Sequence, residues 1–169
     1  MKRIRSLSQL TIALIMLMSL SLAAGKPDLS GTWVLDKTRS FSNPPGLDQT
    51  MTIVHKGDEV SLHASVIVQG KETLVNETWV LDGKEREFTP PGAPPGIKGN
   101  RRASWMPGQR GILVEDQSTI NSPQGRIQQQ TTRKYTLSAD GHSLLVDYFI
   151  DRPGQSFESK RVFVRKSNS

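Results

Sequence analysis

Residues 49–69, which read QTMTIVHKGDEVSLHASVIVQ, decide the expected fold. Apolar and polar residues alternate on both sides of Gly57-Asp58, a pair that favours a tight two-residue turn between antiparallel strands. A turn at this position pairs Ile53 with Leu62 and gives the hairpin one buried face and one face in water. The expected buried face carries Met51, Ile53, Val60, Leu62 and Ala64. The expected wetted face carries Thr52, Ser61 and His63.

Short β-rich runs of the same kind extend through the rest of the chain. They are separated by Gly, Pro, Asn and Asp, and no window of about ten residues after residue 24 combines helical spacing with the absence of Gly and Pro. Asp82-Gly83 predicts a further hairpin, whereas residues 90–99 (PPGAPPGIKG) interrupt the pattern. The predicted strands are 31–36, 49–56, 59–69, 73–81, 84–88, 101–105, 111–119, 127–137, 143–150 and 157–165.

These runs predict an all-β fold, an antiparallel up-and-down meander of about eight to ten strands. An open meander leaves two unpaired edges, so we favour closure into a lipocalin-like β-barrel. A two-sheet sandwich with Greek-key crossovers is the alternative. Residues 25–169, about 145 residues, are a normal length for one domain.

The first residues have the pattern of a secretory signal peptide. Lys2, Arg3 and Arg5 precede an apolar run at 10–22, and small residues at 23–25 suit a signal peptidase. The apolar run is too short to cross a hydrocarbon layer of ~30 Å, so no membrane span is expected. We therefore expect residues 1–24 to be removed and the mature protein to be periplasmic or secreted.

Charge and cysteine content exclude several classes of function. The formal net charge of +6 comes with no cysteine in the chain, and the leader carries three of the basic residues. The longest basic runs are Arg101-Arg102 and Arg133-Lys134, so a clustered nucleic-acid-binding face is not expected. Without cysteine there is no disulfide, no zinc–sulfur site and no acylated lipoprotein.

The late strands place a mixed face next to an apolar one. If residues 139–141 form a three-residue loop, Arg133 pairs across the hairpin with Asp147. The face of Arg133 then carries Tyr135, Leu145 and Phe149, and such a polar pair inside an apolar lumen could orient a ligand. The alternative assignment places Arg133–Asp147 on the solvent-exposed face as a surface ion pair. In that case the core face carries Leu144, Val146, Tyr148 and Ile150.

No catalytic or metal-binding constellation is visible in the sequence. His55 and His63 face opposite ways in the predicted hairpin, and His142 lies beside a turn, so a shared metal ion is not expected. Glu115 and Asp116 are neighbours on a strand and point to opposite faces. We expect no cofactor, and we expect the charged residues to lie on solvated faces.

The segment at 28–33 (DLSGTW) resembles the start of the lipocalin and calycin barrels, which begin with Gly-x-Trp. The resemblance implies that Trp33 plugs the closed end of the barrel and that a basic residue of the last strand, Arg161 or Arg165, packs across its ring. True lipocalins have a helix after the last strand, and this chain lacks one.

The chain also resembles a set of bacterial exported proteins of undefined activity. The shared motifs are L-x-G-T-W-x-L at 29–35, D-G-K-E at 82–85, Trp105 before a Gly turn, and T-L-S-x-D-G-x-x-L at 136–144. This resemblance implies a lipocalin-like barrel without a known reaction. The segment L-x-G-x-W at 29–33 and the late strand at 149–152 are similar to those of avidins. Arg133-x-Tyr135 is similar to the carboxylate-binding pair of fatty-acid-binding barrels.

These observations favour an exported, lipocalin-like barrel that binds or carries a small hydrophobic or amphipathic ligand without catalysis. Residues 90–99 are a candidate lid over an open end. The alternatives are a solid-core protein-interaction module of the cell envelope, an enzyme with its site in the lumen, and an avidin-like binder. The candidate ligand contacts are Trp79, Trp105, Arg133, Tyr135 and Phe149.

Overall fold

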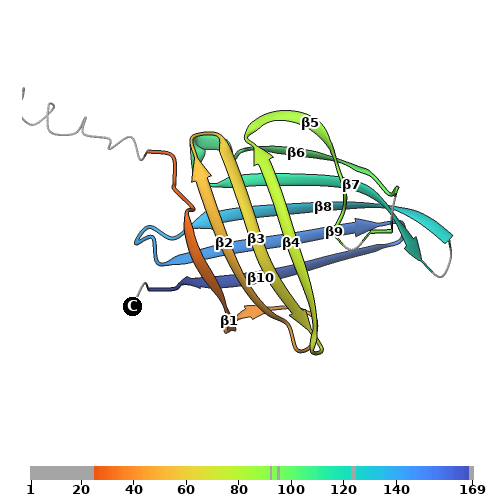
Figure 1. Cartoon of the computed structure of the whole chain (residues 1–169), viewed down its shortest axis with the longest axis horizontal. Coiled ribbons are helices and arrows are strands. Elements are labelled where there is room, and N and C mark those ends of the chain that lie inside the picture. Colours follow the sequence, from red (N-terminus) through yellow and green to blue (C-terminus); the bar gives the residue numbers. More distant parts are fainter. Residues whose placement is uncertain (1–24, 92, 95, 123–124, 168–169) are drawn as a thin grey trace, which may run out of the picture.

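The computed structural model describes residues 25–91, 93–94, 96–122 and 125–167, and the predicted leader lies outside them. The described residues form ten β-strands and one short 3-10 helix, Pro107–Gln109 (Figure 1). The expected all-β fold is therefore confirmed. The strands are β1 (Gly31–Phe41), β2 (Asp48–Lys56), β3 (Glu59–Val68), β4 (Lys71–Val80), β5 (Asp82–Phe88), β6 (Gly99–Trp105), β7 (Ile112–Ser122), β8 (Gly125–Leu137), β9 (Ser143–Arg152) and β10 (Gln155–Arg165).

The strands make one antiparallel sheet in the order β4-β3-β2-β1-β10-β9-β8-β7-β6-β5. Each strand pairs with its sequence neighbours except at β4 and β5, and β1 also pairs with β10, which curls the meander into a barrel. The two ends of the sheet, β4 and β5, are not paired with each other, so the barrel is nearly closed rather than closed. We call the gap between β4 and β5 the seam. None of the described helices is long and apolar enough to span a membrane.

The hairpin predicted at Asp82-Gly83 is wrong, because the seam lies there. Asp82 accepts a hydrogen bond from the Lys84 amide at 3.0 Å and two from the Arg86 guanidinium at 2.8 Å, so its side chain is tied into β5. On the other side, the Leu81 amide donates to the Asp58 carbonyl at 2.8 Å, away from β5. The chain therefore turns a corner between β4 and β5 without pairing them.

The β2–β3 hairpin forms as predicted. Ile53 is opposite Leu62, and Lys56 is opposite Glu59 on either side of the two-residue turn. The predicted apolar face is buried in the barrel, and each of its members is at most 6% exposed. The sequence pattern therefore assigned both register and facing correctly in this part of the chain.

The predicted register of the β8–β9 hairpin is wrong by one residue. The Ser138 amide donates to the Ser143 carbonyl at 2.8 Å, so the loop contains four residues, 139–142, rather than three. The Asp140 carboxylate stabilises this longer loop by accepting a hydrogen bond from the His142 amide at 2.9 Å. Arg133 is therefore opposite Tyr148, and Asp147 is opposite Lys134 on the outer face.

The barrel has two different ends. Because the strands are antiparallel, the turns at 57–58, 106–111 and 138–142 lie at one end, together with Trp33. The connections at 42–47, 69–70, 89–98 and 153–154 lie at the other end. We call these the closed end and the open end. The hydrophobic core fills the closed end, with Trp33, Ile112, Leu144, Val146 and Phe163 fully buried.

Candidate functional site

Trp33 seals the closed end. It is fully buried, and its indole N–H donates to the Leu29 carbonyl at 2.9 Å. The Arg165 guanidinium lies 4.3 Å from the centre of the Trp33 ring and donates to the carbonyls of Ser30 and Gly141. Of the two candidates for this contact, the structure places Arg165 over the indole and Arg161 elsewhere.

The inward-facing side chains become more exposed toward the open end. On β3, Val60 and Leu62 are buried, whereas Val66 and Val68, farther along the same face, are half-buried. The same change occurs on β9, where Leu144 and Val146 are buried and Tyr148, Ile150 and Arg152 are half-buried. The closed half of the barrel is therefore filled by its own side chains, whereas the inward-facing residues of the open half are partly exposed to solvent.

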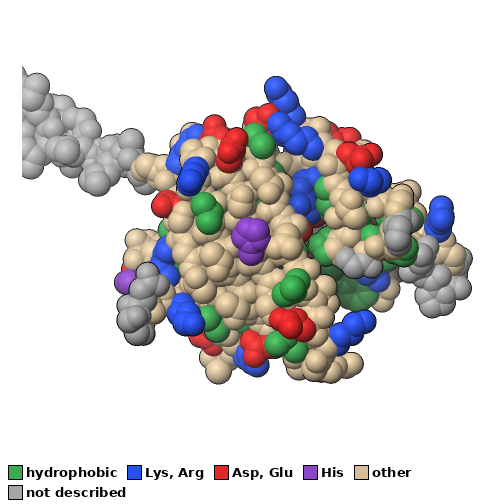
Figure 2. Space-filling model, viewed as in Figure 1, with side chains coloured by type: hydrophobic (Ala, Val, Ile, Leu, Met, Phe, Trp, Pro, Cys, Tyr) green, Lys and Arg blue, Asp and Glu red, His purple; other side chains and the backbone are tan. Residues whose placement is uncertain are grey.

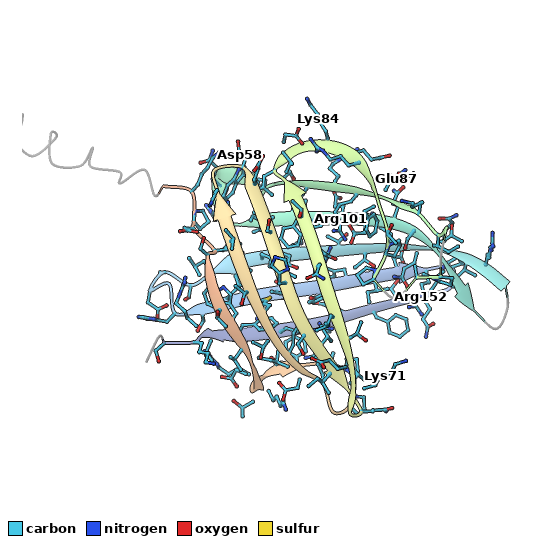
Figure 3. All side chains as sticks on the ribbon, viewed as in Figure 1. Asp58, Lys71, Lys84, Glu87, Arg101 and Arg152 are labelled. Carbon is cyan, nitrogen blue, oxygen red and sulfur yellow. The ribbon has the colours of Figure 1, made fainter. Side chains whose placement is uncertain are left out.

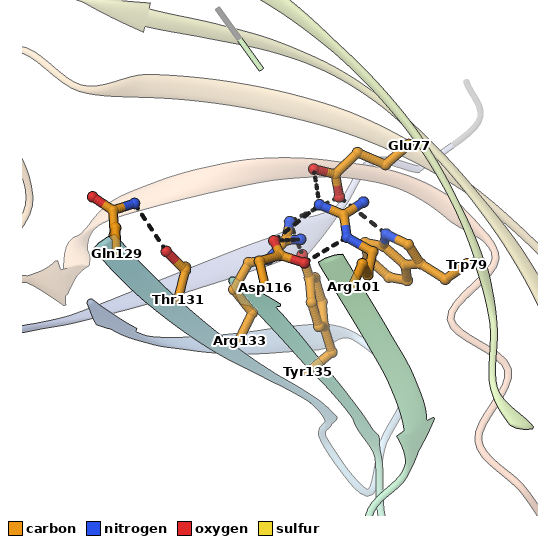
Figure 4. Close-up of polar contacts among 8 residues, drawn as sticks. All are labelled: Glu77, Trp79, Arg101, Asp116, Gln129, Thr131, Arg133 and Tyr135. Carbon is orange, nitrogen blue, oxygen red and sulfur yellow. Dashed lines mark hydrogen bonds and ion pairs between the residues drawn. The ribbon is translucent and has the colours of Figure 1, made fainter. Parts of the chain in front are cut away.

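Four charged side chains meet where the two halves join (Figure 4). The Glu77 carboxylate on β4 accepts from Arg101 on β6 at 3.0 Å and from Arg133 on β8 at 2.8 Å. Asp116 on β7 accepts from Arg101 at 2.6 and 2.9 Å and from Arg133 at 2.8 Å. Two arginines and two carboxylates thus form a closed network, which we call the charge cluster.

The charge cluster is buried, and its surroundings favour the charged forms of Glu77 and Arg133. Burial raises the pKa of Glu77, but the charges of Arg133 and Arg101 outweigh it, and the pKa is lowered overall. Burial also disfavours the charged form of Arg133, yet Tyr135, Glu77 and Asp116 hold the Arg133 pKa well above its usual value. The pKa of Tyr135 is raised mainly by burial, so its hydroxyl stays protonated. Unpaired charges at such depth would be very costly, which explains why each one faces an opposite charge.

Aromatic rings surround the charge cluster. The Trp79 indole N–H donates to Glu77 at 3.0 Å, and its ring lies 5.0 Å from the ring of Tyr135. The ring of Phe88 on β5 lies 4.1 Å from the Arg101 guanidinium. These contacts shield the charges from water on the side of the closed end, where Trp79 and Tyr135 are buried.

A small pocket of about 90 Å³ lies across the seam, between β4 and β5. Figure 2 shows a hollow in this face of the molecule, and Figure 3 shows Arg101 beside β4, with Lys84 and Glu87 across the seam. The pocket joins exposed side chains of β5 to buried residues of the lumen, so the seam is a thin part of the barrel wall. Its lining residues are Thr78, Trp79, Val80, Lys84, Arg86, Glu87, Phe88, Arg101 and Ala103.

A larger polar hollow of about 720 Å³ lies at the open end, between the β7–β8 hairpin and the β9–β10 turn. Arg152 lies in its wall and donates to the Gln129 side chain at 2.7 Å. The ladder between β8 and β9 ends at Gln130. Residues 125–129 of β8 extend past this point and pair with β7. The lining residues are Gln117, Gln128, Gln129, Gln130, Asp151, Arg152, Pro153 and Gly154.

Arg161 lies on the lumen side of β10 and is not a member of the charge cluster. It is half-buried and donates to Asn43 at 3.0 Å and to Gln49 at 2.9 Å. Its guanidinium also lies 4.1 Å from the ring centre of Tyr148. Within the described part of the chain, the partners recorded for Arg161 are all uncharged, in contrast to those of Arg101 and Arg133.

The structure brings together three of the five predicted ligand contacts. Trp79, Arg133 and Tyr135 meet at the charge cluster. Trp105 lies at the closed end, where its ring stacks on His55 at 5.4 Å and its N–H donates to Asp58 at 2.9 Å. Phe149 lies on the outer face of β9, with the Lys134 amine 4.9 Å from its ring. Neither Trp105 nor Phe149 faces the open half of the lumen.

Sequence reasoning missed three members of the charge cluster. Glu77, Arg101 and Asp116 were expected on solvated faces, and all three are buried. Strand alternation could have found them, because Glu77 shares a face with Trp79, Arg101 with Ala103, and Asp116 with Val114. The general expectation that charged residues are exposed to solvent was given more weight than this alternation.

No protein-family model and no curated protein matches the chain. Solved structures do match its fold. The REP1-NXSQ fatty acid transporter superposes with a TM-score of 0.54 at 12% identity, covering 84% of this chain and 98% of that chain. The zebrafish ileal bile acid-binding protein, complexed with cholic acid, gives 0.54 at 14% identity, covering 81% and 98%.

A fatty-acid-binding protein from the brain of Drosophila melanogaster gives a TM-score of 0.51 at 14% identity, covering 81% of this chain and 99% of that chain. At these identities the likeness concerns the fold alone. The chain forms a nearly closed barrel of ten antiparallel strands, and this fold matches that of the fatty-acid-binding and lipocalin-like barrels.

Proposed function

We propose that the chain is an exported barrel that binds or carries a small, partly apolar ligand in the open half of its lumen. The observation that carries this proposal is the change in burial along the inward faces of β3 and β9. Val66, Val68 and Ile150 point inward yet are only partly buried, which supports an apolar ligand contact at the open end of the barrel.

The polar groups of the lumen would orient such a ligand. Arg161 is held in place by Asn43 and Gln49, and no acidic side chain among the described residues neutralises it. A guanidinium in this setting favours an acidic or strongly hydrogen-bonding group on the ligand. The fold neighbours are titled as binding fatty acids or a bile acid, which also supports a ligand with an apolar body.

The pKa shifts of Glu77, Arg133 and Tyr135 do not favour acid–base catalysis at the charge cluster. A catalytic acid or base works best with a pKa near the working pH. The pKa of Glu77 is lowered, and the pKa values of Arg133 and Tyr135 are raised, so each moves away from neutrality. We therefore propose a binding protein rather than an enzyme.

Native mass spectrometry tests the binding proposal. The full chain would be expressed in a bacterial host, recovered from the periplasm without detergent and weighed before and after denaturation. We expect a stoichiometric extra mass that denaturation releases, and a protein mass that corresponds to loss of about the first 24 residues, as signal peptidase would produce.

A matched pair of variants locates the bound mass. Val66→Trp places an indole in the open half of the lumen, and we expect it to reduce occupancy at least about tenfold. Val54→Trp makes the same change at an exposed position on the outer face of β2 and should leave occupancy unchanged. Equal occupancy in the two variants would contradict a lumen site.

A protein-interaction module remains the second candidate. The supporting observation is that Phe41, Leu74 and Phe157 are exposed near the open end, with Leu74 70% exposed. Leu144 and Val146 on β9 do not contribute to such a surface, because both are core residues. A clean unliganded mass in the experiment above would favour this candidate.

A further inference from the structure

We propose that the seam between β4 and β5 is a gate to the lumen, and that Glu77 is the latch that holds it shut. The inference rests on the proposed function for its ligand, but opening of the seam can also be measured without one. The latch is the pair of ion contacts that Glu77, on edge strand β4, makes to Arg101 on β6 and to Arg133 on β8.

The seam differs from every other part of the barrel wall. At each of the other junctions the neighbouring strands are joined by a backbone ladder, including the closure of β1 on β10. Parting two such strands breaks several hydrogen bonds at once and exposes their polar groups. Between β4 and β5 no such ladder is present in the described residues, so the seam can widen without that cost.

Side chains of β4 replace the missing ladder. Glu77 reaches across the lumen to Arg101 on β6 and Arg133 on β8, at 3.0 and 2.8 Å. Trp79, two residues later on the same face, lies 5.0 Å from Tyr135 on β8. Edge strand β4 is therefore attached to the opposite wall mainly through one carboxylate and one indole.

The geometry of the cluster makes this attachment reversible. Asp116 bonds to both arginines independently of Glu77, so the arginines keep one carboxylate partner when Glu77 moves away. The pocket of about 90 Å³ already joins the surface of β5 to Trp79 and Arg101. Outward movement of β4 would enlarge this pocket into a passage to the lumen.

Cross-linking tests the gate directly, because the chain has no native cysteine. Thr78→Cys and Glu87→Cys place thiols on exposed residues that line the same pocket from opposite sides of the seam. A flexible bis-maleimide would join them. We expect the locked protein to take up and release the neutral dye Nile red at least about tenfold more slowly than the protein before cross-linking.

The matched control uses the same reagent within the paired wall. Ser61→Cys and Thr78→Cys lie opposite each other on β3 and β4, where a ladder already holds the strands together. Cross-linking this pair should leave the dye rates unchanged. If locking the seam also leaves them unchanged, the ligand enters through the open end and the gate is overturned.

Glu77→Gln tests the latch, and Glu72→Gln is its control on the exposed part of the same strand. We expect Glu77→Gln to speed hydrogen exchange of the β4 and β5 amides, and uptake of the dye, at least several-fold relative to Glu72→Gln. Equal exchange in the two variants would overturn the latch. Failure of the wild-type protein to bind any dye would instead count against the proposed function, while amide exchange would still report whether the seam opens.

Discussion

Glu77 decides the electrostatics of the interior. It is buried, it contacts both buried arginines, and it also accepts from the Trp79 indole. Removing one partner from such a network leaves a buried charge uncompensated, which typically costs about 3–5 kcal/mol. A single carboxylate therefore matters here far more than the exposed ion pairs on the outer surface, which are typically worth about 1 kcal/mol or less.

The lowered pKa of Glu77 predicts a pH dependence of stability. A carboxyl whose pKa is lower in the folded than in the unfolded state stabilises the fold above its unfolded pKa, and this contribution is lost as the pH falls through the folded pKa. We expect the free energy of unfolding to decrease below about pH 4.5, the usual pKa of a glutamate.

Denaturant melts across pH, comparing wild type with Glu77→Gln, measure this effect. Wild type should be the more stable protein at pH 7, and the difference should shrink as the wild-type carboxyl becomes protonated. A difference that stays constant down to pH 3 would contradict this account of Glu77.

The sequence is sufficient to predict which face of its strand each residue of the charge cluster occupies, but not that the charged side chains are buried there. Strand parity puts Glu77, Arg101 and Asp116 on inward faces, yet parity says nothing about where the neighbouring strands bring opposite charges. Arg133 was predicted as a site residue because it shares a face with Tyr135, and that facing holds in the structure. The ion pairs join residues that are 15 to 56 positions apart in the sequence, and a local sequence pattern does not reveal contacts over such separations.

At the scale of the strands and turns, the predictions that failed are those that depend on hydrogen bonds made by an Asp side chain in a turn. Gly57-Asp58 forms the predicted two-residue turn, because both flanking strands have apolar faces that register together. Asp82-Gly83 has similar residues but forms a corner, since the Asp82 carboxylate bonds to Lys84 and Arg86 within β5. At residues 138–142, one Asp side chain adds a residue to the loop and shifts the pairing of two strands.

The connection between β6 and β7 is tightly packed around Gly111. A Cβ at this position would lie 2.1 Å from the Tyr135 carbonyl oxygen, which is backbone and cannot move away easily. We expect Gly111→Ala to destabilise the protein by about 1–3 kcal/mol, as other overpacked sites do.

Gly57→Ala is the comparison for Gly111→Ala. A Cβ at Gly57 meets nothing within 4 Å, so only its left-handed backbone (φ 64) opposes the change. That conformation costs about 1–2 kcal/mol for a residue other than glycine. Thermal melts with a larger loss for Gly57→Ala than for Gly111→Ala would show that the close approach of β6–β7 to β8 is not the dominant constraint.

At the scale of the whole molecule, the barrel is a linear series of hairpins that β1 and β10 close and that the seam leaves open. The break in the ladder falls where the chain itself is continuous, between Val80 and Asp82. In a hairpin, the connecting residues join two strands that pair with each other. The residues between Val80 and Asp82 join two strands that do not pair.

This arrangement predicts where the chain tolerates new ends. Lys26 contacts Asp58 and Trp105, and Lys166 bonds to Thr32, so both ends of the described chain lie at the closed end and a flexible linker can join them. A circular permutant that begins at Asp82 should keep its fold, because no ladder depends on the peptide bond that is cut. A permutant that begins at Asp58 opens the β2–β3 turn and should lose more stability in denaturant melts. The opposite order would mean that the corner at residues 81–82 organises the barrel.

The three tryptophans occupy three separate environments: Trp33 sealed in the closed end, Trp79 beside the lumen, and Trp105 partly exposed next to Lys26 and His55. The molecule thus carries its own set of optical probes. With Trp79 as the sole indole, emission should respond to lumen occupancy. With Trp33 as the sole indole, emission should report global unfolding. With Trp105 as the sole indole, emission should report whether the segment around Lys26 is packed against the ring. Uptake, unfolding and docking of that segment can therefore be followed separately in one protein without attaching a dye.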